Sequence, residues 1–228
     1  MARLARVVIP NIPHHVTQRG NRRSTVFWDE DDYQAYYDLL LDATIKAGTE
    51  VWAYCLMPNH VHMILVPTDE QGLRATFADA HRQYTRRINS RNKWTGHLWQ
   101  GRFGSVAMDE EHLVNAVRYV SLNPVRAGLV EKAEGWPWSS ARAHLGLQQD
   151  RLVKVEPVLQ RMPDFAAQLA VGEREEFSNR LRKAESVGRP IGSKKWLEKM
   201  EKQTGRTLKA KKRGRKVDKT SPKSKLSP

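Results

Sequence analysis

Two histidines separated by one apolar residue, His60 and His62, are the side chains of this chain best suited to chemistry. They follow a Pro-Asn turn signal and open the apolar run 63–66, which predicts a buried strand. Side chains alternate along a strand, so both imidazoles lie on one face, about 7 Å apart, while Val61 points into the core. Such a pair can bind one divalent ion. The alternative, two polar side chains on a solvated face, stays open from the pair alone.

A second candidate group lies on a helix expected after Asp109. Acidic residues begin this helix, and Pro124 is expected to end it near Asn123. Tyr119 and Asn123 are four residues apart and therefore stack on one helical face. A phenol can act as a nucleophile, and an amide oxygen is a suitable ligand for Mg²⁺ or Mn²⁺. The alternative is a core tyrosine beside an asparagine that caps the helix.

The elements that position these groups alternate between strand and helix. This order predicts an α+β fold, a ferredoxin-like sandwich whose central antiparallel sheet carries the His-Val-His motif. We expect strands over 14–18, 50–56, 60–66 and 102–107, and helices from 29 to about 47, from 71 to 91 and from 109 to 123. A short closing helix is expected to start at Trp136-Pro137-Trp138-Ser139-Ser140.

Charge divides the chain unevenly. Residues 186–228 hold fifteen Lys and Arg against three acidic residues, so +12 of the net charge of +14 falls there. We therefore expect a compact domain over 1–148, a peripheral helical extension over 149–185 and a basic, flexible tail over 186–228. A basic block of this kind favours a polyanion, most often nucleic acid. The tail lacks the apolar face that a membrane-surface helix would need.

Composition also indicates the cellular compartment in which the protein is expected. Cys55 is the single cysteine, which excludes an intramolecular disulfide framework and argues against a structural zinc site. The first residues do not resemble a signal peptide, and no apolar run approaches the roughly 20 residues that span a bilayer. We expect a cytoplasmic protein that does not bind membranes.

Five motifs, in order over about residues 7–147, resemble those of the REP-associated tyrosine transposases, which are single-tyrosine transposases of the HUH superfamily. They are the first strand with Arg-Gly-Asn-Arg-Arg (14–23), Met-Pro-Asn-His-Val-His (57–62), Leu-Trp-Gln-Gly-Arg-Phe (98–103), Arg-Tyr-Val-Ser-Leu-Asn-Pro-Val-Arg-Ala-Gly-Leu-Val (118–130) and Trp-Pro-Trp-Ser-Ser (136–140).

The resemblance implies a role for each matched residue. His60 and His62 would be the paired ligands of a divalent metal ion, Mg²⁺ or Mn²⁺, and Asn123 the third ligand. Tyr119 would be the nucleophile. Members of this family act on single-stranded DNA folded into a hairpin, cut one strand and remain joined to its 5′ end. The REP-associated kind are expected to act as monomers, while related insertion-sequence enzymes work as dimers, so a dimer stays open here.

We expect DNA contacts from three places: the loop after the first strand, the basic face of the second helix and the tail. The candidate residues are Arg19, Arg22, Arg23, Arg82, Arg86, Arg102, Arg189, Lys194, Lys195, Lys211, Lys212, Arg213, Arg215 and Lys216. Within the tail, 188–190 and 213–215 resemble AT-hook cores, whose arginine enters a narrow minor groove. Non-specific, salt-sensitive phosphate binding is the alternative. Either mode implies association with the nucleoid.

Three functions compete at this point. The first is a metal-dependent DNA strand transferase that uses Tyr119. The second is a non-cleaving DNA-binding regulator derived from a transposase, and the third is a metal hydrolase in which His60 and His62 activate water. A covalent protein–DNA adduct distinguishes the first from the other two, because neither binding nor hydrolysis joins DNA to the protein.

Overall fold

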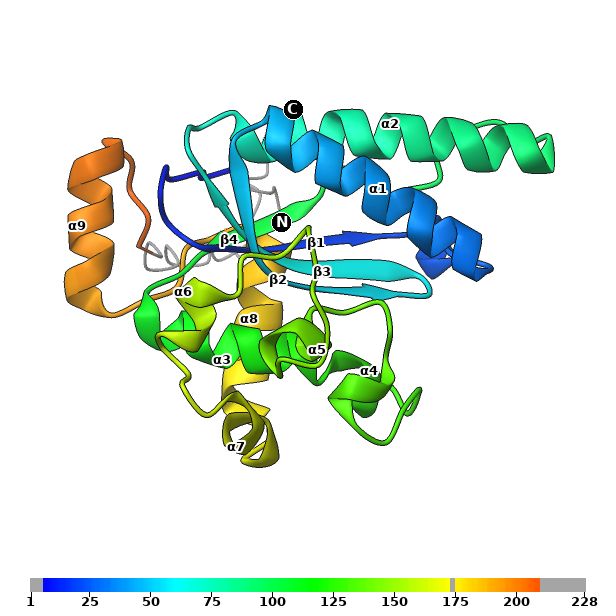
Figure 1. Cartoon of the computed structure of the whole chain (residues 1–228). Helices are drawn as coiled ribbons and strands as arrows, with labels where there is room; N and C mark the ends of the chain where they lie inside the picture. The colour runs from blue at the N-terminus through cyan, green and yellow to red at the C-terminus, as the bar shows by residue number, and fades with distance from the viewer. Residues whose placement is uncertain (1–5, 173–174, 210–228) are drawn as a thin grey trace, which may run out of the picture.

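The computed structural model describes residues 6–172 and 175–209. Four antiparallel strands form one sheet in the order β2-β3-β1-β4 (Figure 1). The strands are β1 (His14–Arg19), β2 (Thr49–Met57), β3 (His60–Pro67) and β4 (Gly104–Ala107). With helix α1 (Glu30–Lys46) between β1 and β2 and helix α2 (Gly72–Asn92) between β3 and β4, this is the predicted ferredoxin-like arrangement.

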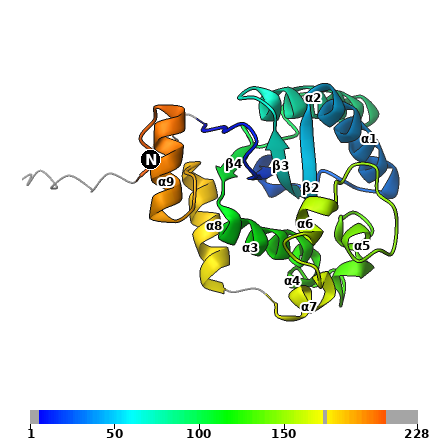
Figure 2. The same ribbon diagram turned by 60° about the vertical axis from the view of Figure 1, so that its left-hand side comes forward.

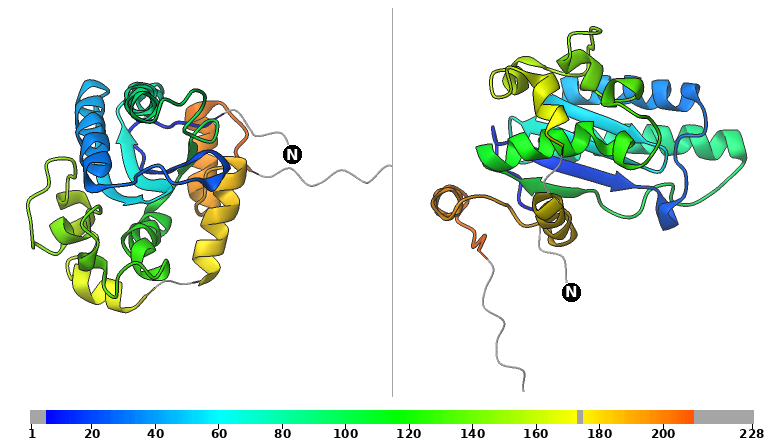
Figure 3. Two further views of the ribbon diagram at one scale, coloured as in Figure 1. Left: turned by 90° about the vertical axis from the view of Figure 1, so that its right-hand side faces the viewer. Right: turned by 90° about the horizontal axis from the view of Figure 1, so that it is seen from below.

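One face of the sheet is covered by α1 and α2 (Figure 3, left). Helix α1 starts where predicted, because the side chain of Asp29 accepts a hydrogen bond from the backbone N–H of Asp32 and caps the first turn. Tyr36, Phe77 and Tyr84 are buried between these helices and the strands. Burial of each such large side chain stabilises the fold by roughly 1.5–3 kcal/mol.

The opposite face carries a second core built on α3 (Glu110–Ser121) and α8 (Glu175–Val187) (Figures 1 and 2). Short helices complete this layer: α4 (Asn123–Arg126), α5 (Ala141–His144), α6 (Glu156–Leu159) and α7 (Phe165–Ala170). Val158, Phe165 and Leu181 are buried in it. The prediction of a peripheral extension was therefore wrong, since that segment covers a sheet face that α1 and α2 leave open.

The beginning of the basic tail is folded, in contrast to the flexible tail expected over 186–228. Helix α9 (Lys194–Thr204) lies beyond the β4 edge (Figure 2), and its Met200 is buried together with Leu208 and Ile9. Apolar residues at helical spacing within the charged sequence explain this order. Residues Lys211, Lys212, Arg213, Arg215 and Lys216 lie outside the described residues.

Three predicted boundaries differ from the structure by two residues or more. Strand β4 starts at Gly104 rather than at residue 102, and the short closing helix starts at Ala141 rather than at Trp136. Helix α3 ends at Ser121, and Pro124 lies in the first turn of α4, where a missing N–H costs nothing. Among the described residues, no helix combines the length and apolarity that crossing a bilayer requires.

Candidate active site

The sheet places a third histidine next to the predicted pair. Side chains of β1 and β3 alternate between the two faces, so His15 and His62 project to the α3 side, where His62 is only 1% exposed. The Nε2 atom of His15 lies 3.0 Å from Nδ1 of His62, and the two rings are stacked with centroids 5.1 Å apart. The antiparallel pairing of strands 14–18 and 60–66 is the signal that would have found His15.

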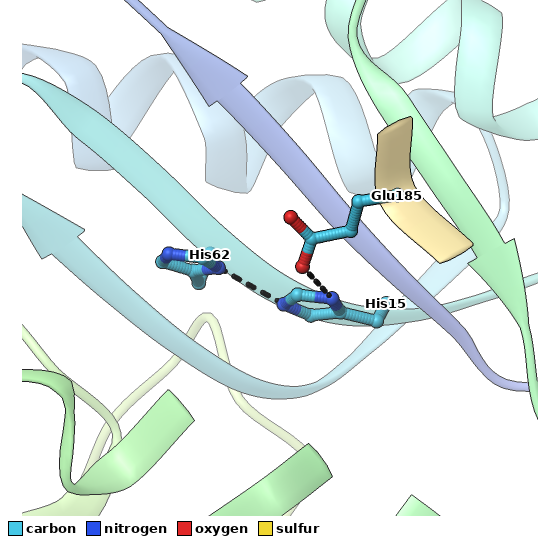
Figure 4. Close-up of side chains that lie close together, drawn as sticks. All are labelled: His15, His62 and Glu185. Carbon is cyan, nitrogen blue, oxygen red and sulfur yellow. Dashed lines mark hydrogen bonds and ion pairs between the residues drawn. The ribbon is translucent and has the colours of Figure 1, made fainter. Parts of the chain in front are cut away.

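Helix α8 adds a carboxylate to this pair. An Oε1 oxygen of Glu185 lies 3.0 Å from Nδ1 of His15, as Figure 4 shows. The contact has an ion-pair distance without hydrogen-bond alignment, and neither atom has another partner among the described residues. One potential ligand atom each from Glu185, His15 and His62 lies within 4.8 Å of the others. No local sequence pattern marks Glu185, because only the docking of α8 brings it here.

These contacts favour one arrangement of protons on the two rings. A carboxylate only accepts, so Glu185 favours a proton on Nδ1 of His15 and leaves Nε2 of that ring as an acceptor. Nδ1 of His62 then donates to it, which leaves Nε2 of His62 with a free lone pair. Outer carboxylates commonly orient metal-binding histidines, and here Glu185 would act on His62 through His15.

His60 reaches the same state through a different partner. Its Nδ1 lies 2.6 Å from the side-chain Oδ1 of Asn59, an acceptor, so the proton resides on Nδ1 and Nε2 carries the lone pair. Burial, with the charges of Arg19 and Arg126, lowers the pKa of His60 to about 3. Burial and the neighbouring His60 also hold the pKa of His62 well below its usual value. Both rings are therefore neutral at physiological pH, and this donor set fits a divalent ion.

Tyr119 lies directly against the histidines. Its ring centroid is 5.4 Å from that of His62 and 5.8 Å from that of His15, with both contacts edge-on. The guanidinium carbon of Arg126 is 4.2 Å from the centre of the tyrosine ring. A positive charge therefore faces the ring on which negative charge would develop if the phenol lost its proton.

Asn123, the predicted third ligand, is buried at the start of α4. Its Oδ1 accepts a hydrogen bond from the guanidinium of Arg126 at 2.9 Å, while its Nδ2 has no partner among the described residues. The amide is thus tied to the same arginine that covers Tyr119. Metal binding by Asn123 stays a prediction, and the carboxylate of Glu185 is a second oxygen donor on this face.

An arginine-rich groove of 570 Å³ runs from β1 past the loop at 100–102 to α8 and reaches Glu185. Its walls include the predicted DNA-binding residues Arg19, Arg23 and Arg102, joined by Arg182. Guanidinium groups match the geometry of phosphate oxygens. The groove therefore offers a path for a nucleic-acid backbone beside the histidines.

Other predicted DNA-binding residues lie elsewhere. Arg82 and Arg86 are exposed on α2, which covers the opposite face of the sheet, and Arg82 pairs with Asp79. Arg189 donates a hydrogen bond to the carbonyl of Leu208, while Lys194 and Lys195 begin α9 beyond β4. The structure does not bring these residues together with His62 and Tyr119.

The sequence of the segment that carries this site matches a known family. Residues 9–123, half of the chain, match the sequence profile described as transposase IS200 like. This chain belongs to the IS200-like transposase family. The matched segment runs from before β1 to the start of α4 and contains His15, His60, His62, Tyr119 and Asn123.

Relatives of this IS200-like transposase carry a more specific name. This chain is 26% identical over 125 residues to the REP-associated tyrosine transposase of Escherichia coli. The aligned segment covers 53% of this chain and 70% of the relative. The chain is 30% identical over 102 residues to a Haemophilus influenzae protein given the same name. That match covers 40% of this chain and 58% of the relative, less than two thirds of its length.

A solved structure has the same fold. It is a REP-associated tyrosine transposase bound to a REP hairpin, superimposed with a TM-score of 0.56 at 20% identity. The match covers 68% of this chain and 98% of that structure. The fold predicted from the alternation of strands and helices is thereby confirmed.

Proposed function

We propose that this transposase cuts and rejoins one strand of hairpin DNA, with Tyr119 as the nucleophile and His60 and His62 holding a divalent ion. The observation that carries the proposal is the pair of adjacent neutral imidazoles, His60 and His62, with the ring of His62 directly against that of Tyr119. Family membership supports the same reaction, and the chemistry follows from the residues.

Each residue has a definable task. His60 and His62 would hold Mg²⁺ or Mn²⁺, with Asn123 as the third ligand that the family resemblance implies. The bound ion would polarise the scissile phosphate and offset the charge on its non-bridging oxygens. The Oη oxygen of Tyr119 forms a bond to phosphorus and the 3′ oxygen leaves, giving a 5′-phosphotyrosine and, after protonation, a 3′-hydroxyl.

The covalent intermediate is what makes rejoining feasible. The phosphotyrosine linkage retains the phosphodiester that hydrolysis would lose, so a 3′-hydroxyl can reverse the reaction. A phenol has a pKa near 10 in water, and its proton must leave before or during attack. The guanidinium carbon of Arg126, 4.2 Å from the ring centre, places a positive charge over the ring of the attacking residue.

Hairpin DNA is the proposed substrate. The solved relative binds a REP hairpin, and the arginine-rich groove reaches the candidate site from the side of β1. The net charge of +14 favours any polyanion and strengthens this binding without sequence preference. We propose action as a monomer at the nucleoid, where chromosomal hairpins form.

The test uses single-stranded hairpins labelled at either end, incubated with the protein and Mg²⁺ or Mn²⁺, and separated by denaturing electrophoresis. The expected result is a slow-migrating protein–DNA adduct that needs the metal and is absent for Tyr119→Phe. Cleavage without an adduct would indicate hydrolysis. Binding without cleavage on every hairpin tested would indicate a DNA-binding regulator, and either outcome would overturn the proposal.

A further inference from the structure

Two tryptophans are exposed at the end of the sheet that carries His60. Trp28 is 43% and Trp94 52% exposed, and they are the only aromatic residues among the large exposed hydrophobic side chains of the described residues. Their ring centroids are 5.8 Å apart at an interplanar angle of 67°. Both rings line a pocket of 580 Å³. Exposed aromatic rings grouped at a pocket are typical of a binding surface.

Trp28 is held in this exposed position. Its backbone N–H donates to the buried carboxylate of Asp32 at 3.0 Å, just before α1 begins. The guanidinium of Arg91 lies 5.8 Å from the centre of the Trp28 ring and makes two hydrogen bonds to Asp32, at 2.7 and 2.8 Å. The indole is therefore supported from α2 rather than left to move freely.

Trp94 is fixed in a similar way. Helix α2 ends at Asn92, and the next residue, Lys93, has a φ of 53° that turns the chain sharply. The N–H of Trp94 then donates to the carbonyl of Asn89 at 2.8 Å. The side chain of Asn89 donates to the carbonyl of Gly96 at 3.1 Å and closes the loop around the indole. The backbone at both tryptophans is thus held before any ligand arrives, and the two rings contact each other, which lowers the entropy lost on binding.

Apart from Leu98, the remaining side chains that line the pocket are polar. They include Asn21, Arg22, Ser24, Thr25, Thr95 and His97. These side chains offer hydrogen-bond donors and acceptors together with one positive charge. A suitable ligand would have a flat ring that stacks on an indole, polar groups on the edge of that ring that pair with the polar wall, and an attached phosphate that pairs with Arg22. An apolar peptide segment would leave the polar wall unpaired.

The loop over residues 21–23 connects this pocket to the candidate active site. Arg22 and Arg23 both have positive φ angles, 53° and 63°, which are uncommon for non-glycine residues. Arg22 lines the tryptophan pocket, while Arg23 lines the arginine-rich groove. The carbonyl of Arg23 accepts a hydrogen bond from Asn59, the residue that also contacts His60. A DNA strand in the groove therefore passes within reach of the pocket.

We propose that the pocket between Trp28 and Trp94 binds one unpaired base of single-stranded DNA, stacked on an indole, with Arg22 on the adjoining phosphate. This inference rests on the proposed function, because it assumes a DNA substrate with an unpaired segment. Every base can stack on an aromatic side chain, while the polar side chains of the pocket form hydrogen bonds with the edge of the bound base.

The test measures binding of two labelled hairpins by fluorescence anisotropy, one with four unpaired nucleotides at its foot and one blunt-ended, in the Tyr119→Phe background. Trp94→Ala should weaken binding of the footed hairpin about 10-fold or more and leave the blunt hairpin unchanged. Trp28→Ala should do the same, and Trp94→Phe should restore most of the affinity. Leu147→Ala, which removes an exposed apolar side chain outside the pocket, is the matched control.

An abasic nucleotide at one foot position should reproduce the loss of affinity for the footed hairpin. Combining the abasic hairpin with the Trp94→Ala variant should weaken binding little further. Circular dichroism verifies that each variant is folded. Equal losses on both hairpins, or no loss on either, would overturn the pocket assignment alone. Failure of the parent protein to bind either hairpin would overturn the proposed function as well, and adduct formation by the unmodified chain tests that function independently.

Discussion

His14 and His15 are neighbours on β1, yet they belong to two different environments. His14 is buried, with Nδ1 donating to the carbonyl of Ile12 and Nε2 accepting from the N–H of Ile9. His15 projects to the other face and contacts His62 and Glu185. Backbone groups satisfy the first ring completely, whereas the second contacts only side chains that can themselves bind ligands or move protons.

The same division separates the two faces of the whole sheet. On β3, Val61 and Met63 enter the core under α1 and α2, while His62 faces Tyr119 and His60 contacts the ring of His62. Because strand side chains alternate between the two faces, the residues that stabilise the core and the residues of the candidate site occupy alternate positions of the same strands. Substitutions on one face should therefore unfold the protein, and substitutions on the other should inactivate a folded protein.

The sharpest test of this division is Tyr119→Phe. Loss of the hydroxyl should reduce adduct formation on hairpin DNA at least about 1000-fold, because the nucleophile is gone. The free energy of unfolding should change by less than about 1 kcal/mol, since the ring still packs against His15 and His62. Denaturing electrophoresis and urea unfolding measure the two effects. Comparable adduct yield from the variant would remove Tyr119 from the reaction.

Phe77→Ala should have the reverse effect. Phe77 lies on the core-facing side of α2 and is 1% exposed. Truncating a buried phenylalanine to alanine costs about 3–5 kcal/mol of stability. The fraction that remains folded at low temperature should still bind Mn²⁺ with the affinity of the unmodified protein. Urea unfolding and calorimetric titration check both statements. A selective loss of metal affinity in folded Phe77→Ala would show that the faces are coupled.

Glu185→Ala probes the carboxylate that orients His15 and, through it, His62. Removing this outer partner should weaken Mn²⁺ binding about 10- to 100-fold, as measured by titration calorimetry without DNA. Glu176→Ala, an exposed glutamate on the same helix, should have no effect. Glu185→Gln distinguishes two roles, because its amide oxygen can still face Nδ1 of His15 while the negative charge of the carboxylate is lost. Retained affinity in Glu185→Gln supports orientation, while loss equal to that of the alanine variant supports direct ligation.

Local patterns were sufficient to predict one half of this site. Strand alternation predicts that His60 and His62 share a face, and helical spacing predicts that Tyr119 lies near Asn123. The predicted single helix is nevertheless divided between these two residues, because α3 ends at Ser121 and Asn123 begins α4. Glu185 could not be found in this way, because its place depends on α8 docking against α3 and β4. Likewise, the average charge of residues 186–228 concealed Met200 and Leu208, whose burial orders α9.

The smallest expected effect concerns acid stability and His14. Burial lowers the pKa of His14 to about 4, below the ordinary value of 6.5 that it regains on unfolding. The unfolded chain therefore binds more protons between these values, and stability falls as the pH drops from 6.5 toward 4. From pH 7 to pH 5 this linkage lowers the free energy of unfolding by about 2 kcal/mol.

The side chain of the His14→Gln variant cannot be protonated in this range. Its free energy of unfolding should therefore fall by about 2 kcal/mol less over the same interval, even if the variant is less stable at pH 7. Urea unfolding at both pH values measures the difference. Parallel losses in the two proteins would mean that the ring of His14 accepts a proton without leaving its place, and the contrast with His15 would then lose its basis.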